Sequence, residues 1–204
     1  MTNLVLTITL GSALHHGSGF GLSGLVDRTV LRDASGSPYL AASAIKGKLR
    51  HATLRVLLAE GQPACHTGDV ERWCVTQSSC ALCRLFGSPR SEGALFFTDA
   101  YPPGDTRKLI EELAQLRLPG GLSRDSTTRS QTSIDRKFGT ARPHLLFSTE
   151  VLPSFLTFES MIHGGSSDHF ELLRRACRVI THFGADGARG LGECTLAIRE
   201  EAAK

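Results

Sequence analysis

The stretch HFGADGARGLGECTL, residues 182–196, places four glycines and one arginine between a predicted helix and a predicted strand. Glycine lets a backbone adopt positive φ and approach another group closely. A dinucleotide-binding fingerprint follows a strand, whereas this stretch follows a helix, and its spacing is not GxGxxG, which disfavours a nicotinamide or flavin site. Successive amides in such a turn can hold an anion, and Arg189 can contact a phosphate, although a tight turn without a ligand has the same composition.

The hydrophobic pattern on both sides of this loop predicts a mixed α+β chain. Ser43 is placed to cap a long helix, and Gly47 within that helix indicates that another group packs close to the backbone. The predicted elements follow the order β-α-β-β-α-β of a ferredoxin-like (RRM-like) fold. They cover residues 4–10, 43–60, 93–100, 148–164, 167–183 and 192–200.

Two insertions decorate this core, and no linker divides the chain, so we expect a single domain over residues 1–204. Residues 61–92 form an irregular segment that carries four cysteines. Residues 101–149 begin with a short helix and continue into a polar, basic stretch at about 122–142. A structureless stretch of this length is uncommon in a compact domain and indicates a functional excursion or disorder.

The charge distribution indicates local basic faces more clearly than the net charge of +3 does. One basic group contains Lys46, Lys48, Arg50 and Arg55, and the other contains Arg124, Arg129, Arg136, Lys137 and Arg142. No secretory signal is visible, and no apolar run approaches the roughly 20 residues of a membrane span. We therefore expect a soluble cytoplasmic protein without a membrane partner, whose cysteines are thiols or metal ligands.

The cysteine spacing C-x8-C-x5-C-x2-C in the first insertion predicts a structural zinc site. The four ligands are Cys65, Cys74, Cys80 and Cys83, and His66 is an alternative to Cys65. A metal would help this apolar-poor segment to fold. The H-x-E and P-C-x-x-C motifs of a nucleobase deaminase are absent from the sequence. Cys177 and Cys194 lie on the second long helix and the last strand and are predicted to be core residues.

Several stretches together resemble the RAMP superfamily, and above all the repeated backbone subunit of type III CRISPR effector complexes. The likeness covers nearly the whole chain in the right order. It is carried by GSALHHGSGFGLSGLVDRTVLRD (11–33), GSPYLAASAIKGKLR (36–50), CRLFGS (83–88) with ALFFTDA (94–100), SIDRKFGTARPHLLFSTEVLP (133–153) and the glycine-rich GADGARGLGEC (184–194).

The resemblance implies that several copies bind a guide RNA as a filament, together with other effector subunits and a target RNA. It also implies a thumb-like hairpin within 101–149, with Ile134 as a wedge against a base. Phosphate contacts position RNA without reading its sequence, and the chain lacks the RNP1 pattern of an ordinary RRM. The RNA-binding candidates are His15, Ser43, Lys46, Lys48, Arg50, Arg129, Ile134, Arg136, Lys137, Gly187 and Arg189.

The resemblance further places Asp27 where many family members cut target RNA with the help of a divalent metal, Mg²⁺ or Mn²⁺. A carboxylate there can hold the metal or orient the 2′-hydroxyl for attack on the adjacent phosphate. The family often has a small polar residue and a proline next, whereas Arg28 and Thr29 follow here. Arg28 can stabilise the phosphorane or pair with Asp27. The nearby Asp33 fits a turn better.

Three other functions remain open from the sequence. The chain can be a guide-binding scaffold in a complex where another subunit cuts. Asp27→Ala distinguishes this function from cleavage by Asp27, because only a catalytic Asp27 predicts that the variant loses metal-dependent cuts while it still binds RNA. It can be a guide-processing endonuclease, which would act through histidine and resist EDTA. It can also be a zinc-bearing protein-interaction module, which predicts no salt-sensitive RNA binding.

Overall fold

A four-stranded antiparallel sheet forms the centre of the computed structural model, which describes residues 3–201 except 23, 66–73, 75–79 and 117–122. The strand order is β2-β5-β1-β6. The central strand β1 pairs through Leu6 with Ser160 on one side and Ile198 on the other. The strands are β1 (Asn3–Leu10), β2 (Phe96–Phe97), β5 (Thr157–His163) and β6 (Cys194–Glu200).

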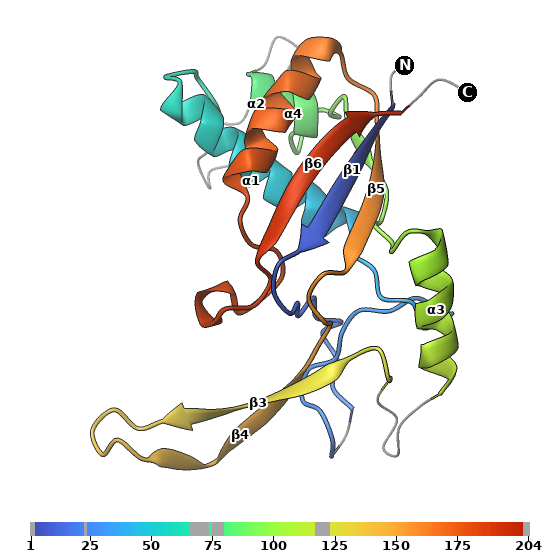
Figure 1. Cartoon of the computed structure of the whole chain (residues 1–204). Coiled ribbons are helices and arrows are strands. Elements are labelled where there is room, and N and C mark those ends of the chain that lie inside the picture. The colour runs from blue at the N-terminus through green and yellow to red at the C-terminus, as the bar shows by residue number, and fades with distance from the viewer. Residues whose placement is uncertain (1–2, 23, 66–73, 75–79, 117–122, 202–204) are drawn as a thin grey trace.

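Two long helices, α1 (Ala42–Ala59) and α4 (Ser167–Val179), lie side by side against this sheet (Figure 1). The short helix α2 (Ala81–Phe86) packs beside α1. Leu4, Leu6, Ile8 and Leu10 on one face of β1 are almost completely buried, in the same core cluster as apolar residues of α1 and α4. Cys177 and Cys194 belong to this core, as the sequence predicted, and burial raises the pKa of their thiols to about 12 and about 11.

A separate two-stranded hairpin, β3 (Thr127–Ile134) and β4 (Ala141–Val151), extends away from the main sheet (Figure 1). The helix α3 (Gly104–Gln115) precedes it in the chain. The prediction of one strand over 148–164 is wrong, because this segment is divided between β4 and β5. Pro153 lies in the break, where it has no backbone N–H to donate to a ladder.

Two further expectations about the core elements are corrected. The strand expected at 93–100 is reduced to Phe96–Phe97, with Ala100 in an isolated bridge to Leu40. Ser43 does not cap α1, because the helix begins one residue earlier. The carboxylate of Asp99 instead accepts a hydrogen bond from the N–H of Ala42 at 2.7 Å, so a residue distant in the chain satisfies the helix start.

Candidate nucleic-acid interface and metal centre

The glycine loop, defined here as residues 182–193, folds back on the loop between β1 and α1. Gly184 and Gly192 have φ of +75° and +74°, and a Cβ at either position would overlap a carbonyl oxygen, that of His15 or of Phe183. The N–H of Gly192 donates to the carbonyl of Ala13 at 2.7 Å. These two glycines are therefore required by contacts within the chain itself, and a ligand is not needed to explain them.

The glycine loop and the start of α1 lie on the same side of the molecule and line one open hollow of about 580 Å³. Gly47 lies at this hollow, and a Cβ there would meet no atom within 4 Å apart from the adjacent residues and backbone of α1 itself. The sequence predicted a group packed closely against the helix at Gly47, and no part of the described chain is that group. The lining residues are His15, His16, Gly17, Ala44, Gly47, Lys48, His51, Phe183, Gly184 and Ala185.

The candidates on α1 and the first loop (residues 11–41) differ in their surroundings, and His15, although it lines this hollow, is buried. His15 is 3% exposed, and its Nδ1–H donates to the carbonyl of Glu150 at 2.8 Å. Lys46 faces a separate hollow beside residues 86–93. Arg50 donates to the carbonyl of Gly87 at 2.9 Å, so this side chain also anchors the segment after α2. Ser43 is exposed near the start of α1.

The hairpin brings a second set of candidates together with the glycine loop. Arg129 on β3 and Arg189 in the glycine loop line one hollow of about 520 Å³, together with Gln131 and Phe147. Arg189 donates to the side-chain carbonyl of Gln131 at 2.6 Å. The middle of the glycine loop thus contacts the hairpin through Arg189, whereas Gly187 lies near the side chain of His182.

The tip of the hairpin is exposed and carries both apolar and basic side chains. Ile134 is 60% exposed, and the turn after it is closed by Asp135, whose carboxylate accepts from the N–H of Lys137 at 2.8 Å. Arg136 and Lys137 are exposed in this turn. Phe138, which the sequence analysis did not single out, is 70% exposed and lies under the Lys137 ammonium, 5.3 Å from the ring centroid.

Asp27 lies where the first loop runs alongside the base of β4. Its Oδ2 accepts from the N–H and the hydroxyl of Ser148 at 2.7 and 3.3 Å. The carboxylate is exposed, and Arg28 does not pair with it, because the Arg28 guanidinium contacts Asp186 instead. Asp33 forms the expected turn, in which its Oδ1 accepts from the N–H of Ser35 at 3.0 Å.

A buried ionic network, which the sequence gave no sign of, fastens the first loop to the hairpin. Arg32 contacts Asp125 at 2.8 Å and Glu150 at 2.9 Å. Glu150 is 3% exposed and also accepts from the N–H of Val30 and the hydroxyl of Ser126. Although burial opposes the charge, the two carboxylates raise the pKa of Arg32. Removing one partner of such a group leaves a buried charge unpaired and costs about 3–5 kcal/mol.

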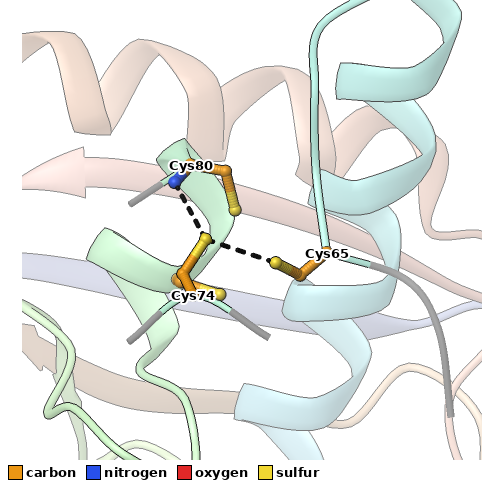
Figure 2. A group of neighbouring side chains, drawn as sticks. Cys65, Cys74 and Cys80 are labelled. Carbon is orange, nitrogen blue, oxygen red and sulfur yellow. Dashed lines mark hydrogen bonds between the residues drawn. The ribbon is translucent and has the colours of Figure 1, made fainter. Parts of the chain in front are cut away.

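Four cysteines form the metal-ligand cluster that their spacing predicted. The Sγ atoms of Cys65, Cys74, Cys80 and Cys83 all lie within 4.8 Å of one another. Cys65 Sγ and Cys74 Sγ are 3.3 Å apart, and the N–H of Cys80 donates to Cys74 Sγ at 3.4 Å (Figure 2). Four sulfur ligands fit a closed tetrahedral zinc site, with Zn–S distances of about 2.3 Å. His66, the alternative ligand, lies outside the described residues.

The cluster also favours a thiolate at one of its sulfurs. Burial raises the pKa of the Cys80 thiol, but backbone N–H groups of Cys83 and Cys65 bond its sulfur and lower the pKa to about 7. A thiolate is the form of cysteine that binds metal. Among the described residues, this is the one group of three or more histidine, cysteine and acidic side chains arranged for a metal.

Comparison with known proteins identifies the class to which this fold and these loops belong. The model of the RAMP superfamily matches residues 7–195, and the chain belongs to this superfamily. The fold is similar to that of a chain in Type III-B Cmr-beta cryo-EM structures, one in the apo state and one bound to cognate target RNA. Each comparison gives a TM-score of 0.65 and 15% identity, over 96% of both chains.

The search among curated proteins gave no match. Within the described part of the chain, no helix has the length and apolar character needed to span a membrane.

Proposed function

We propose that the chain is a guide-RNA-binding backbone subunit of a type III-like CRISPR effector complex. Its core is ferredoxin-like, which the order β2-β5-β1-β6 and the two helices α1 and α4 support. Membership in the RAMP superfamily and the similarity of the fold to a chain of Type III-B Cmr-beta support the proposal that this chain is a subunit of such an effector complex. In this proposal several copies lie along one guide, and the β3–β4 hairpin is the thumb.

One observation carries the RNA-binding part of the proposal: the glycine loop, the first loop and α1 surround a shared hollow. Lys48 brings a positive charge to it, and Gly47 leaves the helix backbone open on that side. A phosphate backbone is recognised by such basic, sterically open surfaces without base-specific contacts. Lys46, Arg129, Arg136, Lys137 and Arg189 extend the basic surface around the hollow and along the hairpin.

The same proposal assigns cleavage of paired target RNA to Asp27. RNA supplies its own nucleophile: the 2′-hydroxyl loses its proton to water as its oxygen bonds to the adjacent phosphorus, the bond to the 5′-oxygen breaks, and water supplies a proton to that leaving oxygen. The Asp27 carboxylate would orient the 2′-hydroxyl or hold the divalent ion. Asp27 belongs to no described group of three metal-ligating residues. A single carboxylate suits Mg²⁺ or Mn²⁺ that keeps water and phosphate ligands, and the ion would neutralise charge on the phosphate.

A non-catalytic scaffold is the second candidate, and the bond between Asp27 and Ser148 favours it. The Oδ2 of Asp27 accepts the Ser148 N–H at 2.7 Å, so this carboxylate has a structural task at the base of the hairpin. Asp27→Asn separates the two roles, because an amide oxygen can still accept that N–H while the charge is lost.

The test uses the protein purified with a co-expressed guide and a labelled complementary target RNA, with and without Mg²⁺. Asp27→Asn and Asp27→Ala are compared with Asp105→Asn, an exposed aspartate at the start of α3. Loss of Mg²⁺-dependent cuts in both Asp27 variants, with guide binding retained, supports cleavage by Asp27. Guide binding without any cutting by the parent chain supports the scaffold, and EDTA-resistant cutting of a precursor guide supports processing. Unchanged cutting by Asp27→Asn would overturn the assignment of cleavage to Asp27. A purified complex free of RNA would overturn the RNA-binding assignment.

A further inference from the structure

One carboxylate joins two arginines that are far apart in the sequence. Asp186, in the glycine loop, contacts Arg28 of the first loop through Oδ2 at 3.1 Å and Arg189 through Oδ1 at 3.3 Å. Each oxygen serves a different guanidinium, so the Asp186 side chain sets the spacing of two positive groups. Asp186 has φ of +58°, a left-handed conformation that aspartate and asparagine tolerate better than most residues.

Both arginines have further anchors on the hairpin. Arg28 donates through Nε to the hydroxyl of Thr149 at 3.1 Å, and its guanidinium lies over the ring of Phe147, 5.3 Å from the centroid. Arg189 donates to Gln131 at 2.6 Å. A guanidinium has five N–H donors, so these bonds hold each arginine in place and leave donors for a ligand.

The exposure of the three side chains shows from which side a ligand reaches them. The side chain of Asp186 is 15% exposed, whereas those of Arg28 and Arg189 are 37% and 57% exposed. An anion from solvent therefore meets the arginines first and does not need to displace the carboxylate. The hollow of about 520 Å³ beside Arg189 adds Arg129 and the hydroxyls of Ser130, Thr132 and Ser133.

We infer that Arg28 and Arg189 together bind one phosphodiester of single-stranded RNA, with Asp186 as the residue that positions them. The inference rests on the proposed function, since it names a phosphate contact within the same interface. Paired guanidinium groups match the two free oxygens of a phosphodiester. Arg28 directly follows Asp27 in the chain, although the Asp27 carboxylate contacts Ser148 and the Arg28 guanidinium contacts Asp186.

The test measures binding of a fluorescently labelled, unstructured single-stranded RNA to the full chain by anisotropy, over a series of KCl concentrations. Arg28→Ala and Arg189→Ala are each expected to weaken binding roughly tenfold, because a charge-assisted contact is lost. Each is also expected to lower the slope of log K against log salt by about 1. The matched control is Arg199→Ala, an exposed arginine paired with Glu159 at the other end of β6.

Asp186→Asn tests the positioning role, since asparagine keeps the backbone conformation and one acceptor but no charge. We expect it to weaken binding about threefold and to lower the salt slope, a readout that a purely structural residue would not move. Tighter binding with a steeper slope would show that Asp186 competes with phosphate, and would overturn the inference. If the parent chain shows a steep salt dependence of RNA binding and both arginine variants keep the same affinity and slope, the inference is overturned but the proposed function is not. Salt-insensitive binding in the parent chain would overturn the proposed function as well.

Discussion

Gly184 lies directly against the carbonyl oxygen of His15, and the next N–H, that of Ala185, donates to the same oxygen at 2.9 Å. This contact joins the glycine loop to the first loop, so both loops reach the hollow beside α1 as one unit. The positive φ disfavours a side chain at this position, and the close carbonyl leaves no room for one.

We therefore expect Gly184→Ala to destabilise the fold by at least about 2 kcal/mol, since the left-handed conformation alone costs about 1–2 kcal/mol. For a chain of this size the melting temperature would fall by at least about 4 °C. Thermal unfolding followed by circular dichroism measures the change. Gly190→Ala is the control, because Gly190 has φ of +80° with open space around it and should cost about half as much. Equal losses in the two variants would contradict the role given to the His15 contact.

The sequence predicted those features of the site that depend on local pattern. The helix before the glycine loop and the strand after it follow from hydrophobic periodicity, and the cysteine cluster follows from ligand spacing. The composition of the polar stretch at about 122–142 predicts only a functional excursion or disorder, because it is poor in core residues, and the hairpin is implied by the family resemblance alone. Residues 127–134 form β3 because all of them except Ser133 pair with β4, and a partner strand cannot be predicted from the segment itself.

Contacts between distant residues could not be predicted from the sequence. Arg28 and Asp186 are 158 residues apart, and Arg32 and Glu150 are 118 residues apart. Asp99 caps α1 from 57 residues away, so the prediction that the nearby Ser43 caps this helix is wrong. In each case a polar side chain has several chemically suitable partners, and only the folded topology selects one of them.

Removal of metal should unfold the cysteine segment while leaving the main core in place. We expect one zinc per chain in the purified protein, measured by inductively coupled plasma mass spectrometry, and its loss in Cys74→Ser. Loss of metal should lower the melting temperature, because a closed structural site contributes binding energy to folding. Cys177→Ala, a buried core cysteine outside the cluster, should keep the zinc. Full zinc content in Cys74→Ser would contradict a four-cysteine site.

Stability should fall as the pH drops below about 6.5, because His16 is held neutral in the fold. Burial, with a smaller effect of His15, lowers the pKa of His16, and its Nε2 accepts the N–H of Ala41 at 3.3 Å. An unfolded histidine takes up a proton near pH 6.5. The contribution is therefore complete above that pH and is lost as the pH falls through 6.5 toward the lower folded value.

Urea unfolding at pH 8, 7, 6 and 5.5 measures this dependence. His16→Gln should reduce the slope of unfolding free energy against pH, by no more than about 1.4 kcal/mol per pH unit. The slope should not vanish, because burial, together with Arg84, also lowers the pKa of His169. A variant with the slope of the parent chain would show that His16 does not contribute to it.

Gly47 allows stability and RNA binding to be changed in opposite directions. A methyl group at this helical position meets nothing within 4 Å apart from the adjacent residues and backbone of α1 itself, so Gly47→Ala should stabilise the fold by about 0.5–1 kcal/mol. The same methyl enters the hollow where the RNA backbone is proposed to lie, so the affinity for single-stranded RNA should fall several-fold. Gly104→Ala is the matched control, at the open start of α3, and should leave RNA binding unchanged. Raised stability with unchanged RNA affinity in Gly47→Ala would place the RNA elsewhere on the surface, whereas lowered stability would reveal a neighbour that α1 needs at this position.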